Sequence, residues 1–364
     1  MADGTKPSSH GRNKKTRKRR SGRSGQKARK LYAALDLGTN NCRLLIATPS
    51  AGGFRVVDGL SRIVRLGEGL EQTEKLSDAA MDRALEALKA CSFKLAKSKV
   101  KRIRAVATQA CRIAGNGREF VDRVQKETGI SLKVISTEEE ARLALRGCHD
   151  LLDHSCEAAL VVDIGGGSSE VSWVKLSGDT VVEEKNVRKN VRLSKWVSLD
   201  IGVVTIAERF PERDDRQSWY QEMVEYAQEK IAAFTEANDF REIFERGNIH
   251  YIGTSGAVTS LGGVHLDLPS YDRSKVDGMW LDVEDTDKVI LRLLSHDLQA
   301  RAKEPCIGEE RADLVLAGCA ILQAIQREWP AKRIRVADRG LREGLLLSMM
   351  SFDRRRRGPR GRRR

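Results

Sequence analysis

One local pattern occurs twice and decides the fold, first as Leu31-Tyr-Ala-Ala-Leu-Asp36-Leu-Gly38-Thr39-Asn40-Asn-Cys-Arg-Leu-Leu-Ile-Ala47 and then as Ala159-Leu-Val-Val-Asp163-Ile-Gly165-Gly166-Gly167-Ser168-Ser169-Glu170-Val-Ser-Trp-Val174. Each copy predicts a strand that ends in aspartate, a tight turn of Gly, Ser or Thr, and a second strand. Glycines let backbone N–H groups approach an anion closely, and small hydroxyls add donors. Two such hairpins, 127 residues apart in the sequence and facing each other in space, would clamp a phosphate chain from both sides.

Length and composition restrict the class of protein. A chain of 364 residues with 40% hydrophobic content predicts one large domain or two medium ones. The sequence contains no run of 18 apolar residues and no apolar signal region near its start, so neither a membrane span nor a signal peptide is indicated. The seven cysteines form no CxxC pair, which favours reduced thiols and a cytoplasmic location.

The positive charge is concentrated at the two ends. Residues 1–30 hold 12 Lys or Arg and one Asp, and residues 354–364 hold 8 Arg and no acid. The two ends together carry a charge of +19. Since the net charge of the whole chain is +14, residues 31–353 carry −5. We expect disordered basic tails. They are either solvated segments without a specific role or electrostatic arms for a polyanion such as RNA or polyphosphate.

The first half reads as a mixed α/β layer. We expect a hairpin and third strand over 31–57, a helix over 76–97, a strand over 103–107, a helix over 118–128 and a strand over 132–135. Ser136-Thr-Glu-Glu139 has the form of a capping box and predicts a helix that runs to about Cys148.

The pattern restarts in the second half. We expect a hairpin over 159–176, strands near 181–186 and 195–201, helices over 203–209 and 217–236, and a strand over 248–253 that leads into a helix. Further helices are predicted over 284–300, 311–327 and 340–350, a strand over 333–337, and surface loops over 178–194 and 265–282. This order predicts a tail over 1–30, domains over 31–148 and 149–339, a helix over 340–353 that packs back near the first domain, and an Arg-rich tail over 354–364.

Phosphate binding is the chemistry that the repeated turns favour. Gly165, Gly166, Gly167 and Ser168 form the more concentrated anion cradle, and Gly38, Thr39 and Asn40 form its counterpart. Thr254-Ser255-Gly256 is another strand-to-turn segment of small residues suited to a phosphate or nucleotide. Carboxylates repel phosphate, so Asp36 and Asp163 are better suited to hold Mg²⁺ or to orient water.

Two further segments carry candidate catalytic groups. Glu138, Glu139 and Glu140 open a helix, where they either complement the helix dipole or supply a general base for water. The sequence does not distinguish among the three for that second role. Arg112 follows a strand and either binds phosphoryl oxygens bidentately or is an ordinary surface side chain. No GxSxG elbow or GxxxxGK[ST] loop occurs, so covalent catalysis is not indicated.

Six segments in order resemble the exopolyphosphatase / guanosine pentaphosphate phosphatase (Ppx/GppA) family of the actin–hexokinase–Hsp70 superfamily. They are Asp36-Leu-Gly-Thr-Asn40, Ala107-Thr-Gln-Ala-Cys-Arg112, Ile135-Ser-Thr-Glu-Glu-Glu-Ala-Arg-Leu143, Val162-Asp-Ile-Gly-Gly-Gly-Ser-Ser-Glu170, Ile252-Gly-Thr-Ser-Gly256 and Ala337-Asp-Arg-Gly-Leu-Arg-Glu-Gly344. The resemblance implies two ribonuclease-H-like domains with an active-site cleft between them. It also implies hydrolysis of a terminal phosphoanhydride in inorganic polyphosphate, in guanosine pentaphosphate (pppGpp, a nucleotide of the stringent response), or in both.

The resemblance also assigns roles to residues. Glu140 corresponds to the proposed catalytic base and Arg112 to a phosphate-contacting arginine. Asp163 with Gly165, Gly166, Gly167 and Ser168 corresponds to the Mg²⁺ and phosphate site, Glu170 to a further acid of that site, and Asp36, Gly38, Thr39 and Asn40 to the first phosphate loop. Family members are commonly dimeric, so a homodimer is implied.

Two other classes of protein fit the same sequence features. One is an ATP-dependent kinase or actin-like ATPase, because a fold does not fix its chemistry. The other is an RNA-associated or polyphosphate-sensing protein in which the basic tails bind the ligand.

Overall fold

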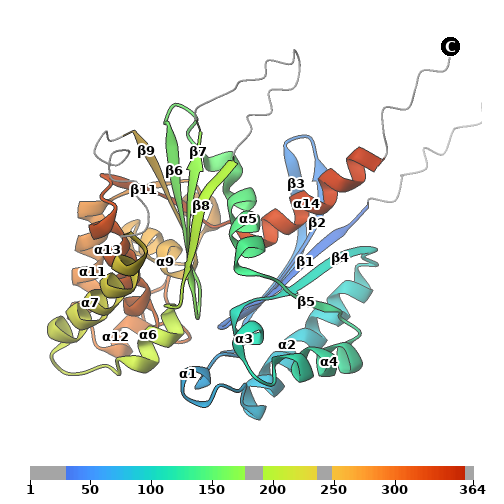
Figure 1. Cartoon of the computed structure of the whole chain (residues 1–364), viewed down its shortest axis with the longest axis horizontal. Coiled ribbons are helices and arrows are strands. Elements are labelled where there is room, and N and C mark those ends of the chain that lie inside the picture. The colour runs from blue at the N-terminus through green and yellow to red at the C-terminus, as the bar shows by residue number, and fades with distance from the viewer. Residues whose placement is uncertain (1–29, 177–191, 236–247, 357–364) are drawn as a thin grey trace, which may run out of the picture.

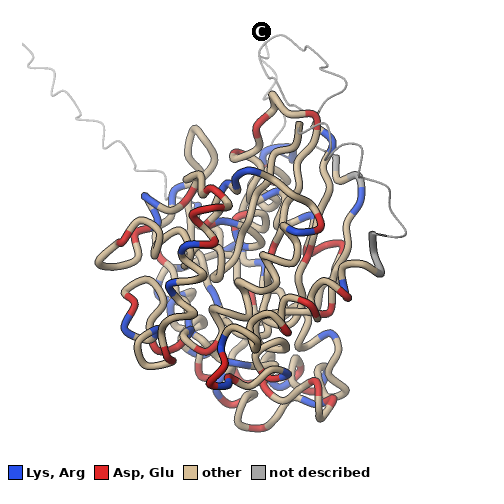
Figure 2. The backbone as a smooth tube through the Cα atoms, turned by 90° about the vertical axis from the view of Figure 1, so that its left-hand side faces the viewer, with Lys and Arg blue, Asp and Glu red and all other residues tan. Residues whose placement is uncertain are grey.

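The computed structural model describes residues 30–176, 192–235 and 248–356 (Figure 1). Two β-sheets form the two halves of the molecule, and helices α5 (Thr137–Cys148) and α14 (Leu341–Arg356) lie between the sheets. Acidic and basic residues are interspersed over the side shown in Figure 2. None of the described helices is long and apolar enough to cross a membrane.

The first sheet has the strand order β3-β2-β1-β4-β5. Its strands are β1 (Tyr32–Leu37), β2 (Asn41–Ser50), β3 (Gly53–Ile63), β4 (Arg102–Ala107) and β5 (Leu132–Val134). The β1–β2 and β2–β3 pairs are antiparallel, and the β1–β4 and β4–β5 pairs are parallel. Side chains alternate between the faces of a strand, so Ala33 and Leu35 pack toward α2 (Asp78–Lys97) while Tyr32 and Ala34 pack toward α14.

The second sheet has the strand order β10-β11-β9-β6-β7-β8. Its strands are β6 (Ala158–Ile164), β7 (Ser169–Lys175), β8 (Arg192–Leu199), β9 (Ile249–Thr254), β10 (Trp280–Asp282) and β11 (Arg333–Ala337). The order and direction of β8-β7-β6-β9-β11 repeat those of β3-β2-β1-β4-β5. The predicted duplication of one α/β unit is therefore confirmed.

Helices complete both cores. The first half also contains α1 (Leu70–Thr73), α3 (Gln109–Ile113) and α4 (Gly117–Thr128), and η1 (His149–Leu151) follows α5. The second half contains α6 (Val203–Arg209), α7 (Arg216–Thr235), α9 (Gly256–His265), α10 (Arg273–Val276), α11 (Val283–Ser295), α12 (Leu298–Ala302) and α13 (Val315–Glu328). Its core joins the strands to α6, α7, α9, α11 and α13.

Several predicted elements were wrong in extent. The helix predicted over 284–300 is two helices, because His296 is extended and the Asp297 side chain accepts a hydrogen bond from Ala300 N to cap α12. The segment predicted as a loop over 265–282 contains α10 and β10. The last helix continues through Arg356, past the predicted boundary at residue 353. The strand predicted near 181–186 lies outside the described residues, as do most of both tails.

The two halves are joined where α5 and α14 cross. A Cβ at Gly147 would lie 2.0 Å from the carbonyl oxygen of Gly340, and a Cβ at Gly344 would lie 2.0 Å from that of Leu143. Only glycine allows backbones to approach so closely. Residues at the ends of four strands line one cavity between the halves: Asp36 of β1, Asn41 of β2, Asp163 of β6 and Ala337 of β11.

Candidate active site

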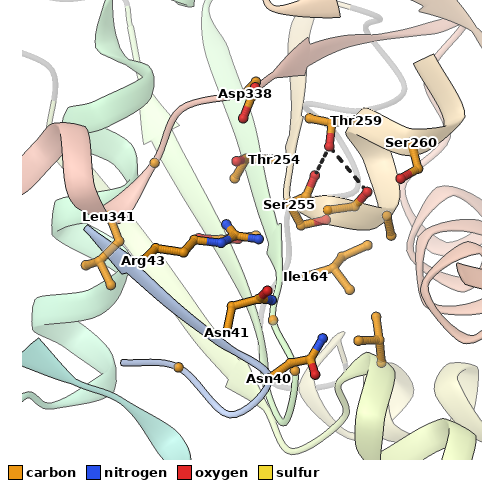
Figure 3. Close-up of a pocket in the computed structure, with 18 of the residues that line it drawn as sticks. Asn40, Asn41, Arg43, Ile164, Thr254, Ser255, Thr259, Ser260, Asp338 and Leu341 are labelled. Atoms are coloured by element: carbon orange, nitrogen blue, oxygen red, sulfur yellow. Dashed lines mark hydrogen bonds between the residues drawn. The ribbon is translucent and has the colours of Figure 1, made fainter. Parts of the chain in front are cut away.

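A cavity of about 500 Å³ lies between the two halves (Figure 3). Thirteen of the residues predicted from the sequence line it: Asp36, Gly38, Thr39, Asn40, Glu140, Asp163, Gly165, Gly166, Ser168, Glu170, Thr254, Ser255 and Gly256. The segments that carry them come from both sheets and from α5. The structure therefore brings together groups that lie up to 220 residues apart in the sequence.

The two glycine turns have the same local geometry and touch each other. Gly38 N donates to Asn41 O over 2.8 Å, and Gly165 N donates to Ser168 O over the same distance. A Cβ at Gly166 would lie 2.9 Å from Asn40 N. Glycine is required there because the second turn packs flush against the first.

The structure separates the three glutamates that open α5. Glu138 is ion-paired with Arg142 on the exposed side, and Glu139 is ion-paired with Arg104 and Lys133. Glu140 alone of the three lines the cavity, and it is 9% exposed. The Ser136 side chain caps the helix by accepting from Glu139 N, which fixes the turn that carries Glu140.

Two residues predicted for the site lie behind the cavity wall. Arg112 Nη1 donates to Ile135 O over 2.9 Å and to Glu140 Oε2 over 3.1 Å, but Arg112 does not line the cavity. Gly167 is buried against Gln109, whose Oε1 would lie 2.0 Å from a Cβ added to Gly167. In this arrangement Arg112 orients Glu140.

Four carboxyl groups that line the cavity, those of Asp36, Glu140, Asp163 and Glu170, disfavour one another's ionisation. Burial raises the pKa of Asp163 to about 6, and the charge of Asp36 adds to the effect. Burial also raises the pKa of Asp36, which Arg43 opposes. Burial raises the pKa of Glu140 well above its usual range, with a further rise from Glu170 and an opposing effect of Arg112.

Glu170 is held by two hydroxyl groups. Ser168 Oγ donates to Glu170 Oε1 over 2.8 Å, and Ser198 Oγ donates to the same oxygen over 3.0 Å. Burial raises the pKa of Glu170 to about 7, Asp163 raises it further, and the two serine donors oppose the shift. The charge of Glu170 in turn adds to the rise in the pKa of Glu140.

Sequence reasoning did not place Arg43 or Arg311 at the site, and it left open whether the segment 338–344, which contains Arg342, reaches the cleft or only packs. All three are half-buried residues that line the cavity. Within the described part of the chain, none of their side chains has a hydrogen-bonded or ion-paired partner. Arg43 extends from the first half toward Thr254 and Ser255 (Figure 3). Half-buried guanidinium groups without a protein acceptor are suited to bind an anion.

The sequence contains a signal for Arg43. In the first hairpin Arg43 is the cross-strand partner of Asp36, and in the second hairpin Glu170 is the partner of Asp163. Both partners follow their aspartate by seven residues. The first hairpin thus has a cation at the position where the second hairpin has an acid.

The cavity contains oxygen atoms suited to a divalent cation, although the described residues do not form a complete set of ligands. The Oδ1 atoms of Asn40 and Asn41 are buried without a hydrogen-bond partner, and both residues line the cavity together with Asp36 and Asp163. Over the described ranges, no group of three or more His, Cys, Asp or Glu side chains is arranged to hold a metal ion. This donor set fits Mg²⁺, which retains water and substrate ligands beside one or two carboxylates.

Two repeated α/β units with glycine turns that face each other across a cavity define a protein of the two-domain actin-like fold class. The chain belongs to the Ppx/GppA phosphatase family, whose model matches residues 45–352. The predicted family and fold class are therefore confirmed, and membership assigns a phosphatase activity to the chain.

Solved structures agree with this assignment. A Ppx/GppA family member from Aquifex aeolicus is 27% identical with a TM-score of 0.70, and the match covers 89% of this chain and 98% of that chain. An exopolyphosphatase from Cytophaga hutchinsonii is 25% identical with a TM-score of 0.76 over the same shares. An exopolyphosphatase-like protein is 29% identical with a TM-score of 0.74, over 88% of this chain and 97% of that chain.

Proposed function

We propose that the protein hydrolyses the terminal phosphoanhydride bond of inorganic polyphosphate, of guanosine pentaphosphate at its 5′-γ-phosphate, or of both. The observation that supports this most is that Glu140, a buried carboxyl with a raised pKa, lines the same cavity as both glycine turns. A base with a raised pKa is effective near neutral pH. Glu140 takes a proton from the water that attacks a phosphorus atom held by the turns.

The chain's own groups bind and orient the phosphates. Backbone N–H groups of the two turns and the N-terminus of α9, which begins at Gly256, donate to the phosphoryl oxygens. Arg43, Arg311 and Arg342 neutralise the phosphates that follow the terminal one. A cavity of about 500 Å³ with three cations that have no ion-paired partner among the described residues supports a substrate that carries more than one phosphate group.

A divalent cation completes the charge balance. One or two carboxylates from the proposed set of Asp36, Asp163 and Glu170 would hold Mg²⁺, with water and substrate oxygens as its other ligands. When bound, Mg²⁺ supplies neutralisation of the phosphoryl charge. The raised pKa of Asp163 supports this role, because a nearby cation would favour the ionised form of a crowded carboxyl.

Parallel phosphate-release assays test the proposal. Long polyphosphate, short polyphosphate and guanosine pentaphosphate are each incubated with the protein, with and without Mg²⁺. We expect Mg²⁺-dependent release from at least one substrate, and the ratio of rates gives the preference among them. No release from any of the three in the presence of Mg²⁺ would reject the proposal.

A second proposed role is polyanion binding by the tails. It is supported by contacts between the first described residues and the end of α14. Asp353, near the end of α14, is ion-paired with Lys30 and with Arg102, the latter over 3.1 Å, and accepts a hydrogen bond from Tyr32 Oη over 2.8 Å. Lys30 therefore lies beside the end of α14, and the basic stretches 1–29 and 354–364 adjoin these two points in the sequence. They contain no Phe, Tyr or Trp, so they would recognise charge without base stacking.

Deletion of residues 1–29 and 357–364 separates this role from catalysis. Unchanged turnover with weaker, less salt-dependent binding of polyphosphate or RNA would make the tails accessory to the enzyme. Absence of phosphate release from both the full chain and the deleted form would favour a sensor.

A further inference from the structure

The segment 64–69, between β3 and α1, is bonded to the first glycine turn. Val64 N and Arg65 N donate to Asn40 O over 2.8 and 3.1 Å, and Gly67 N donates to Thr39 O over 2.9 Å. A Cβ at Gly67 would lie 2.2 Å from Thr39 Cγ2. We call residues 64–69 the strap. It moves with the first turn because it shares three backbone hydrogen bonds with that turn.

Helix α6 is bonded to the second glycine turn in the same manner. Val203 N donates to Gly165 O over 3.0 Å, and Val204 N donates to Gly166 O over 2.8 Å. A Cβ at Gly202 would lie 2.4 Å from backbone atoms of Gly166 and Gly167. The start of α6 therefore fixes the position of the second turn.

The strap and the second half meet in two direct contacts. Arg65 makes a bidentate ion pair with Asp313, with Nη1–Oδ2 and Nη2–Oδ1 distances of 2.9 and 3.1 Å. Gly69 N donates to Glu208 Oε1, in α6, over 3.0 Å. We call these two contacts the latch. Asp313 lies two residues after Arg311 and directly before Leu314, and both of these neighbours line the cavity.

The latch is separate from the α5–α14 crossing. In Figure 1, α1 and α6 approach each other at the lower edge, whereas α5 and α14 cross higher up between the sheets. The cavity is lined by residues on both sides, including Glu140 from α5 and Val203 from α6. Contacts at both ends therefore set the separation of the two halves across the cavity.

We propose that Arg65 is a positioning residue: its ion pair with Asp313 holds the two halves closed, so that both glycine turns and Arg311 face the substrate together. The inference rests on the proposed function, because it assigns the closed arrangement as the one that binds substrate. Loss of the latch lowers the closed fraction before substrate binds, which raises KM. Saturating substrate restores closure, so kcat is largely retained.

Charge reversal tests the pair. Arg65→Glu and Asp313→Arg should each raise KM roughly five- to tenfold with little change in kcat, and the double variant should restore KM to within about twofold. The latch borders a second cavity of about 220 Å³, which gives reversed side chains room without repacking the core.

The matched control is Lys94→Glu. Lys94 and Asp58 are 31% and 38% exposed, as against 34% and 37% for Arg65 and Asp313, but both belong to the first half. Lys94→Glu should leave KM and kcat unchanged. An equal rise of KM in this variant would show that charge reversal acts without the latch.

Hydrogen exchange at the Gly69 amide gives a readout that needs no substrate. This amide donates to Glu208 across the latch, so its exchange should be faster in each single variant and return to the wild-type rate in the double variant. The inference would be overturned if the single variants kept the wild-type exchange rate and KM. It would also be overturned if the double variant recovered neither quantity. A third result is that the Gly69 amide exchanges faster in the single variants and recovers in the double variant while the wild-type protein releases no phosphate. That result would reject the proposed function but leave the latch supported.

Discussion

Arg112 holds Glu140 from the side that faces away from the cavity, through a hydrogen bond of 3.1 Å from Nη1 to Oε2. The same Nη1 atom also donates to Ile135 O, the last residue before the helix cap. The guanidinium is thereby fixed to the backbone and sets the direction of the carboxylate. A carboxylate held in this way retains one oxygen toward the cavity, where a water molecule can meet it.

Replacement of Glu140 should remove the base without disturbing the fold. Glu140→Gln preserves size and hydrogen bonding to Arg112, and phosphate release should fall by roughly 10²- to 10⁴-fold. Glu139→Gln is the control, because Glu139 is the preceding residue but pairs with Arg104 and Lys133 outside the cavity. Near-wild-type release by Glu140→Gln, with circular dichroism confirming the fold, would contradict the assignment.

Removal of Arg112 should shift the pH dependence of the reaction. Arg112 lowers the pKa of Glu140 against the stronger effect of burial, so Arg112→Met should raise that pKa. The base then stays protonated to a higher pH, and the acid limb of the kcat/KM profile moves upward in pH. Arg112→Lys, which retains the charge, should shift the limb less. A uniform loss of rate at every pH would instead favour direct contact of Arg112 with substrate.

Asp163 should destabilise the protein at neutral and alkaline pH. Its pKa is raised from 3.8 to about 6, mainly by burial. The protonated form therefore favours folding, and its contribution is present below about pH 4 and lost as the pH rises through about 6. Asp163→Asn should raise the free energy of unfolding by about 1–3 kcal/mol at pH 8. Urea unfolding without phosphate or divalent cations measures this gain, which should vanish near pH 4.

Arg43 should govern the affinity for polyanionic substrates. Arg43→Met removes a guanidinium that has no hydrogen-bonded or ion-paired partner among the described residues. KM should therefore rise by roughly tenfold with a smaller change in kcat. The variant should also show a weaker dependence of KM on salt. Arg43→Lys retains the charge and should recover part of the affinity. An unchanged KM in Arg43→Met would exclude the side chain from substrate binding.

Gly202 should be intolerant of any side chain. A Cβ there would lie 2.4 Å from the carbonyl group of Gly166 and from Gly167 N, so Gly202→Ala must displace the second turn. Activity should fall by roughly 10²-fold while circular dichroism stays unchanged. Gly52→Ala is the control, because nothing lies within 4 Å of a Cβ at that position. Full activity in Gly202→Ala would show that the turn can move without loss of function.

The hairpins and their turns could be predicted from the sequence because their signals are local. An aspartate at a strand end, glycines at the turn and an apolar second strand are read within 20 residues, and both copies fold as predicted. The resemblance then identified which segments meet at the cavity. The roles assigned to Glu140 and to the metal-binding carboxylates stay predictions for the experiments above.

Residues that depend on tertiary contacts could not be placed. The helical period of the apolar residues predicts a helix over 311–327, with Arg311 at its start. Residues before Val315 form turns instead, and Arg311 lines the cavity. Arg112 was expected to touch phosphate, but its position behind Glu140 depends on the carbonyl of Ile135, which sequence alone does not position.

The last helix has a consequence for how the chain is made. Leu345, Leu346 and Met349 of α14 cover one face of the first sheet by packing on Tyr32 and Ala34, yet they are synthesised about 200 residues after that sheet's last strand. At about 5–20 residues per second, the ribosome leaves this apolar face bare for roughly 10–40 s. The nascent first half therefore cannot bury this face until α14 is made, and this is the interval during translation in which a chaperone would have to shield it.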